Sequence, residues 1–129
     1  MKKNIPFKEI LKIELEGWCY GISNYPGEIH AGLIHRIIQE LQGTICRAME
    51  EDVEIDFVKL GTKIAQASRY MVDEREVTFS LLCQLPNPNY LDGKEQQYVR
   101  RAIQKACETF PEIEQMMELK WKFDEEAVE

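Results

Sequence analysis

The stretch VTFSLLCQLPNPNYLDGKEQQYVRRAIQKA, residues 77–106, carries more structural signals than any other part of the chain. In residues 77–85, apolar side chains alternate with mainly polar ones, and β-branched and aromatic types are common, which predicts a strand central to a sheet. The PNPN turn that follows contains two prolines, which cannot donate to a sheet ladder. The predicted strand therefore ends before the turn.

A helix is predicted directly after this turn. Asp92 followed by Glu95 has the spacing of a capping box, with Asp in place of the usual Ser or Thr. Apolar residues from Val99 to Phe110 then recur at helical spacing, and Pro111 closes the helix near Phe110.

Three further segments show the period-two alternation of a half-buried strand. The first covers residues 11–15 and is expected to run on through Trp18 and Tyr20. The other two cover residues 53–57 and 119–123. Together with residues 77–85, they predict the strands of one sheet.

Two other segments have a helical period. From Glu28 to Ile45 and just beyond, apolar residues recur every four positions, which predicts an amphipathic helix of about 22 residues. Residues 57–71 match the helical template with Asp56 as a cap, although Gly61 would cost about 1 kcal/mol relative to alanine. A second hairpin strand is the alternative for residues 57–71.

The order of these elements predicts an α+β fold. We expect a small, mainly antiparallel sheet with two principal helices on one face. The chain has 129 residues, the size of one ordinary domain. Residues 1–129 are therefore predicted to form a single α+β domain.

The charge of the chain limits the classes of partner that it can bind. It carries 23 acidic and 16 basic residues, a formal net charge of -7. Such a surface repels nucleic acid phosphates, so broad binding to DNA or RNA is disfavoured. A compact phosphate site stays open, because a few local arginines decide it.

The cysteines and the hydropathy pattern indicate where the protein acts. Cys19, Cys46, Cys83 and Cys107 are spread along the chain without a C-x-x-C pair, which disfavours a zinc knuckle or a disulfide framework. No apolar run approaches the length of a membrane span, and the first residues lack a signal-peptide core. We expect reduced, mostly buried thiols in a cytoplasmic protein without a membrane segment.

The sequence contains no recognisable catalytic or metal motif. His30 and His35 are five residues apart, which is about 140° around a helix and unsuited to a shared metal. No G-x-S-x-G, H-E-x-x-H or P-loop occurs. We therefore predict a protein that is not an enzyme and has no catalytic residues, metal site or cofactor.

The strand, turn and helix of residues 77–106 instead predict a ligand site. Arginine offers a rigid fork of donors that suits phosphate and stacks on flat rings. If Val99 is the buried centre of its helix, Arg100 lies about 100° to one side and Arg101 about 200° away. The predicted ligand-binding residues are Phe79, Asn87, Asn89, Tyr90, Arg100 and Arg101. The alternative is that the asparagines only make the turn and the arginines are surface charges.

The order of an aromatic residue at Phe79, an asparagine at Asn87 or Asn89 and an arginine at Arg100 or Arg101 resembles the phage anti-Thoeris proteins. The resemblance implies an α+β oligomer that sequesters a cyclic ADP-ribose signal without cleaving it. Members of that family also use an earlier arginine, for which Arg36, Arg47 and Arg69 are candidates here. In its size, its acidity and its lack of catalytic motifs, the chain resembles small phage-encoded anti-defence proteins in general.

Two functions follow as hypotheses. The first is a non-enzymatic homo-oligomer that sequesters a nucleotide-derived signalling molecule at a subunit interface, as a phage counter-defence. The second is an acidic, protein-binding inhibitor or accessory subunit that acts on a bacterial protein partner. Binding driven by charge should weaken steeply with salt, which separates the second hypothesis from the first.

Overall fold

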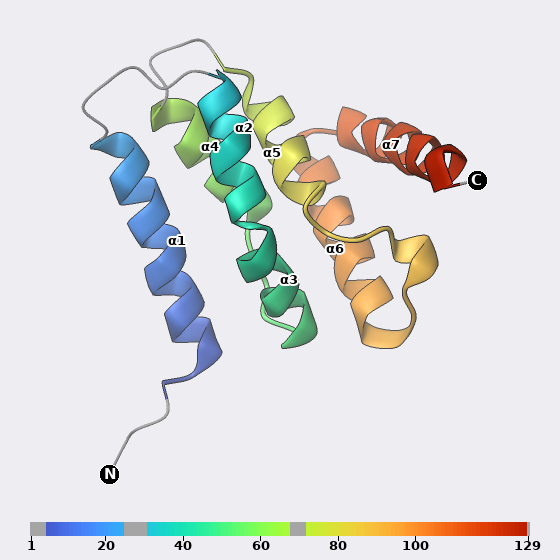
Figure 1. Ribbon diagram of the computed structural model, residues 1–129, viewed down its shortest axis with the longest axis horizontal. Helices are drawn as coiled ribbons and strands as arrows, with labels where there is room; N and C mark the ends of the chain where they lie inside the picture. Colours follow the sequence, from blue (N-terminus) through green and yellow to red (C-terminus); the bar gives the residue numbers. More distant parts are fainter. Residues whose placement is uncertain (1–4, 25–30, 68–71, 129) are drawn as a thin grey trace.

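The computed structural model describes residues 5–24, 31–67 and 72–128, and within these ranges all regular structure is helical (Figure 1). The predicted α+β fold with an antiparallel sheet is therefore wrong, because none of the described residues belongs to a strand. The elements in chain order are α1 (Phe7–Ser23), α2 (Ala31–Glu40), α3 (Gln42–Glu50), α4 (Phe57–Ala67), α5 (Glu74–Leu82), the 3₁₀ turn η1 (Pro88–Tyr90), α6 (Gly93–Thr109) and α7 (Glu112–Val128).

Helix α5 replaces the strand predicted at residues 77–85. Its buried residues are two adjacent pairs four positions apart, Val77 with Thr78 and Leu81 with Leu82, which is one face of a helix. Asp73 caps the helix at its N-terminus, and its side chain accepts a hydrogen bond from the backbone N–H of Arg75 at 2.9 Å. The alternation was compatible with a strand, but the same apolar residues also form a helical stripe.

Helix α1 replaces the strand predicted at residues 11–15. Its inward side chains recur at helical spacing, so that Leu11 and Ile22 are buried and Trp18 is half-buried. Ile13, which the alternation placed beside Leu11 on the core face, is 64% exposed.

Helix α7 likewise replaces the strand predicted at residues 119–123. Ile113 and Met117 are buried one turn apart, whereas Leu119 and Phe123 are 63% and 72% exposed. Trp121, between these two residues in the period-two pattern, is half-buried and packs against the core, so the pattern does not mark one face of a strand.

Residues 53–57 do not form the predicted strand either. Ile55 and Phe57 are buried while Glu54 and Asp56 are exposed, so the alternation does report burial. Within the described ranges no strand lies beside this segment to complete a ladder. Asp56 then caps α4, since its carboxylate accepts from the backbone N–H of Lys59 at 3.0 Å.

The helical interpretation of residues 57–71 is confirmed as far as the structure describes them. Helix α4 runs from Phe57 to Ala67, and residues 68–71 lie outside the described ranges. The alternative of a hairpin strand is wrong for residues 57–67.

The long helix predicted from Glu28 is two consecutive helices, α2 and α3, that join at Leu41. The backbone N–H of Leu41 donates to both Ile38 O at 3.0 Å and Ile37 O at 3.3 Å, so the chain tightens locally at the joint. Residues 28–30 lie outside the described ranges. Leu41 itself is fully buried, so the joint is anchored in the core.

Helix α6 begins and ends where the sequence predicted. Phe110 follows its last residue, and Val99 is buried at its centre. The predicted capping box is wrong, because the side chain of Asp92 makes no capping hydrogen bond.

Helices α4 and α5 form the centre of the fold and share the most extensive helix contact of the described part. Gly61 of α4 lies against Thr78 of α5, where a Cβ would come within 2.5 Å of the Thr78 hydroxyl oxygen. Glycine therefore allows these two helices to approach closely. Helix α1 packs on α4 at one end of the molecule, and α7 packs on α5 and α6 at the other (Figure 1).

Candidate functional site

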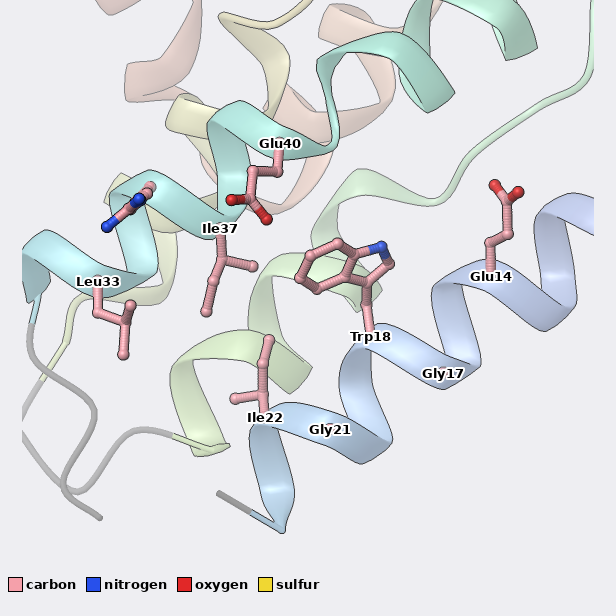
Figure 2. A pocket seen from close by; sticks show the side chains of 9 residues that line it. Glu14, Gly17, Trp18, Gly21, Ile22, Leu33, Ile37 and Glu40 are labelled. Carbon is pink, nitrogen blue, oxygen red and sulfur yellow. The ribbon is translucent and has the colours of Figure 1, made fainter. Parts of the chain in front are cut away.

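An open groove separates α1 from α2. It has a volume of about 590 Å³ and is bounded by both helices (Figure 2). Its lining residues are Glu14, Gly17, Trp18, Gly21, Ile22, Leu33, Arg36, Ile37 and Glu40. The volume falls in the range of about 300 to 1,000 Å³ that is typical of ligand sites.

The walls of the groove are two apolar pairs at helical spacing. Trp18 and Ile22 extend from α1, and Leu33 and Ile37 extend from α2 toward them (Figure 2). Each pair is four residues apart, so both members project from one face of their helix. Trp18, Leu33 and Ile37 are only half-buried, which leaves apolar surface in contact with water.

Two glycines leave part of the α1 side of the groove without side chains. Gly17 and Gly21 also lie four residues apart, and a Cβ built on either would meet no heavy atom within 4 Å. The space beside them is therefore open. These glycines leave room for a molecule that lies along α1.

The rim carries charge. Glu14 lies on the α1 side, and Arg36 and Glu40 lie on the α2 side, all of them exposed. The carboxylate of Glu14 accepts a hydrogen bond from the Thr44 hydroxyl of α3 at 3.4 Å. The rim is thus more acidic than basic, with one acidic group on each wall.

This groove is not predicted by any pattern in the sequence. The sequence predicts a strand for its α1 side and the middle of a long helix for its α2 side, and neither pattern specifies a groove between two helices. The available signal was the pairing of Trp18 with Ile22 and of Gly17 with Gly21, which makes one side of a helix apolar and small.

The structure separates the six predicted ligand-binding residues into different contacts. The side-chain amides of Asn87 and Asn89 both donate to one oxygen of Glu125 on α7, at 3.4 and 2.9 Å. Arg101 instead donates to Asp52 at 3.1 Å, at the end of α3. The asparagines and Arg101 therefore belong to two separate sets of contacts.

The other predicted residues join neither set of contacts through a hydrogen bond that the structure describes. Phe79 is half-buried and packs against the core, Tyr90 is 66% exposed, and Arg100 is exposed. Asn87 also makes the turn, because its side chain accepts from the backbone N–H of Asn89 at 2.9 Å. This Asx turn is the arrangement that the structural alternative predicted.

The cysteines are free and half-buried. Burial raises the pKa of the Cys83 thiol to about 11, and it also raises the pKa of Cys19, Cys46 and Cys107. These thiols are protonated at neutral pH, the form that is poorly nucleophilic.

Within the ranges that it describes, the structure shows neither a cluster of metal-ligating side chains nor a membrane-spanning helix. No three His, Cys, Asp or Glu side chains there gather as a metal site. His35 is exposed and forms a hydrogen bond with Gln39 at 3.2 Å. None of the described helices is both long and apolar enough to span a membrane.

Comparisons of the chain with protein-family models, with curated proteins and with solved structures found no match.

Proposed function

We propose that the protein is a non-catalytic binding protein whose α1–α2 groove receives an amphipathic helix of a partner protein. The observation that carries the proposal is the pair of apolar walls, Trp18 with Ile22 and Leu33 with Ile37, facing each other across open space (Figure 2). A helix laid in such a groove buries apolar residues at positions i, i+3, i+4 and i+7.

The dimensions of the groove specify how much of the partner it holds. Its lining on α1 runs from Glu14 to Ile22, a length of about 12 Å at 1.5 Å per residue. That length accommodates about two turns of a helix. Gly17 and Gly21 allow a close approach of the partner along α1.

The charge of the groove specifies the chemistry of the partner. Glu14 and Glu40 place one carboxylate on each wall, and the whole chain carries a net charge of -7. A partner helix with lysine or arginine beside its apolar face complements both. Opposite charges increase the rate of encounter and fix the orientation, more than they add to affinity.

This function agrees with the second hypothesis from the sequence, an acidic inhibitor or accessory subunit that acts on a bacterial protein in the cytoplasm. In that role the groove masks a helix that the partner uses elsewhere. The protein would need no chemistry beyond binding.

The test uses a labelled synthetic 18-residue helix with leucines on one face and lysines beside them, and a twin peptide with glutamates in place of the lysines. Fluorescence anisotropy at low and high salt reports binding. We expect the lysine peptide to bind at least ten times more tightly than its twin, and the difference to shrink with added salt. Equal binding of both peptides would show that the acidic rim does not select the partner.

Two variants test whether the lysine peptide binds in the groove. Trp18→Ala removes the largest apolar side chain of the lining and should weaken binding of the lysine peptide by at least tenfold. Tyr20→Ala is the matched control, because Tyr20 is on the same helix but is 71% exposed and does not line the groove. Similar losses in the two variants would mean that the peptide binds elsewhere.

Sequestration of a nucleotide-derived signal by a homo-oligomer is the second candidate. Its support is Arg101, which lines a pocket of about 200 Å³ together with Tyr98 and Lys105. This volume lies below the range of about 300 to 1,000 Å³ for drug-sized ligands. A nucleotide would thus need a second copy of the chain to complete its site.

That candidate has a direct assay. The protein is incubated with cyclic ADP-ribose isomers and removed by filtration, and the ligand that remains is measured. A depleted ligand that is recovered intact after denaturation supports sequestration, and an undiminished ligand excludes it.

A further inference from the structure

A second cavity lies between α6 and the segment that connects α3 to α4. It has a volume of about 200 Å³, and its lining residues are Asp52, Glu54, Ile55, Phe57, Tyr98, Arg101, Ala102 and Lys105. It shares no residue with the α1–α2 groove.

Four charged side chains form the solvent edge of this cavity. Arg101 and Lys105 are one turn apart on α6, whereas Asp52 and Glu54 come from the opposite connection. Arg101 contacts Asp52 at 3.1 Å, and Lys105 contacts Glu54. The edge therefore has a basic side and an acidic side, and its formal charges cancel.

These ion pairs can exchange partners at little cost. All four side chains are more than half exposed, between 51% and 66%. Exposed ion pairs contribute about 0 to 1 kcal/mol. A ligand that offers one carboxylate and one ammonium group can place its carboxylate between the two basic side chains and its ammonium group between the two acidic ones.

The backbone presents Asp52 to the cavity in a conformation that favours glycine. Asp52 has a φ of 54°. It follows α3 in a Schellman motif, in which Asp52 N–H donates to Met49 O at 3.1 Å and Val53 N–H donates to Ala48 O at 2.8 Å. A glycine would fit this position with less strain, but it would remove the carboxylate from the acidic side.

The interior of the cavity is apolar and held in place. Ile55, Phe57 and Tyr98 are buried, with exposures of 5%, 3% and 5%. The Tyr98 hydroxyl donates to Val53 O at 2.6 Å, which ties α6 to the connection that carries Asp52 and Glu54. Burial, with the nearby Asp52 carboxylate as a smaller cause, raises the pKa of Tyr98 to about 12, so the phenol keeps its proton.

We propose that this cavity is a binding site for a small zwitterion of the amino acid class with an apolar side chain. The ligand carboxylate contacts Arg101 and Lys105, and its ammonium group contacts Asp52 and Glu54. Its side chain lies on the apolar interior of the cavity.

Size and charge both favour this class. At about 30 Å³ per water molecule, a cavity of about 200 Å³ corresponds to about seven waters, which suits a free amino acid better than a nucleotide. An anion would gain Arg101 and Lys105 but would also face the carboxylates of Asp52 and Glu54. The proposal is independent of the α1–α2 groove and of its helical partner.

The test is a titration of the full-length, ¹⁵N-labelled protein, followed by NMR. The probes are leucine and phenylalanine, with N-acetyl-leucine and leucinamide as single-charge comparisons and AMP as an anionic nucleotide comparison. We expect saturable shifts around residues 52–57 and 98–105 with the zwitterions, and at least tenfold weaker binding of each comparison. Shifts that do not saturate, or equal binding of N-acetyl-leucine, leucinamide or AMP, would overturn the proposal.

Variants locate the site. Arg101→Gln should weaken zwitterion binding by at least tenfold, whereas Arg100→Gln should leave it unchanged, because Arg100 is the next residue on α6 but does not line the cavity. Ala102→Leu fills the cavity and should also abolish the shifts, provided that the rest of the spectrum shows a folded protein. Wild-type binding by Arg101→Gln would show that Arg101 serves only the surface ion pair.

Discussion

Two pairs of helices use glycine in opposite ways. Between α4 and α5, a Cβ on Gly61 would come within 2.5 Å of the Thr78 side chain and within 3.1 and 3.2 Å of its backbone. Between α1 and α2, a Cβ on Gly17 or Gly21 would meet nothing within 4 Å. The first glycine closes a helix contact, and the other two leave a groove open.

The difference teaches that the neighbour of a helical glycine determines what the residue does. In isolation, each of these glycines costs its helix about 1 kcal/mol relative to alanine. At Gly61 the close packing of α4 and α5 compensates for that loss. At Gly17 and Gly21 no contact within the described part of the chain does so, and the open space beside them is the feature on which the proposed groove function depends.

The largest expected effect comes from removing one apolar side chain from each of the two helix pairs. Leu81 of α5 is fully buried, so Leu81→Ala should lower the free energy of unfolding by about 2 to 5 kcal/mol. Trp18→Ala should cost only about 1 to 2 kcal/mol, because the indole is already half-exposed. Urea denaturation measures both values, and equal losses would indicate that the groove is closed in solution.

Gly61→Ala tests the closed contact directly. The added methyl group clashes with the side chain and the backbone of Thr78, and overpacking of this kind costs about 1 to 3 kcal/mol. Removing the Thr78 hydroxyl should relieve part of the strain, so Gly61→Ala should cost less in a Thr78→Ala background than in the wild type. A stabilised Gly61→Ala variant would contradict the close approach of α4 and α5.

Alkaline pH should lower the free energy of unfolding. Burial raises the pKa of Cys83 from 9.0 to about 11 and that of Tyr98 from 10.0 to about 12. Each raised pKa favours the neutral form in the folded state, so its contribution is complete below the unfolded pKa. As pH rises from about 9 to 12, stability should fall, by about 1.4 kcal/mol for each unit of pKa difference.

Thermal unfolding at pH 8 and pH 11 checks this prediction, and Tyr98→Phe is the matched variant. The variant loses the hydrogen bond to Val53 O, which costs about 1 to 3 kcal/mol at pH 8. It should then lose less additional stability at pH 11 than the wild type. An unchanged pH dependence would mean that Tyr98 is not desolvated.

The smallest expected effect has the opposite sign to that of Gly61→Ala. Gly17→Ala adds a methyl group to open space, so it should raise stability by up to about 1 kcal/mol through helix propensity alone. The same methyl group narrows the groove and should weaken binding of the lysine peptide. Denaturation should therefore show a gain in stability and peptide titration a loss of affinity for the same variant. A glycine with only a structural role would not show this combination.

Part of this fold could be predicted from the sequence. The apolar stripes of α2 with α3 and of α6 persist over several turns, and a long stripe has only one periodic interpretation. The shorter stripe of α4 also indicated a helix, but it left a hairpin strand as an alternative. The strands predicted at residues 11–15, 77–85 and 119–123 rested on windows of five to nine residues. Over so few residues, Leu11 with Leu15 or Val77 with Leu81 fits a strand and a helix equally well.

The candidate groove could not be predicted in the same way. Trp18 and Leu33 face each other only because α1 and α2 lie at particular positions on α4 and α5, which no local pattern specifies. The amides of Asn87 and Asn89 show the same limit. Their residue types predicted a ligand contact, but the structure pairs both with Glu125, a residue 36 or more positions away.

The joint at Leu41 fixes the α2 wall of the groove to the core. Leu41 is fully buried, and its backbone N–H donates to both Ile37 O and Ile38 O. On α2 itself, Ile34 and Ile38 are buried as well, with exposures of 3% and 1%. Leu33 and Ile37 therefore cannot move away from Trp18 without repacking the core. A groove held in this way is preorganised, so a partner helix binds without the free-energy cost of reordering its α2 wall.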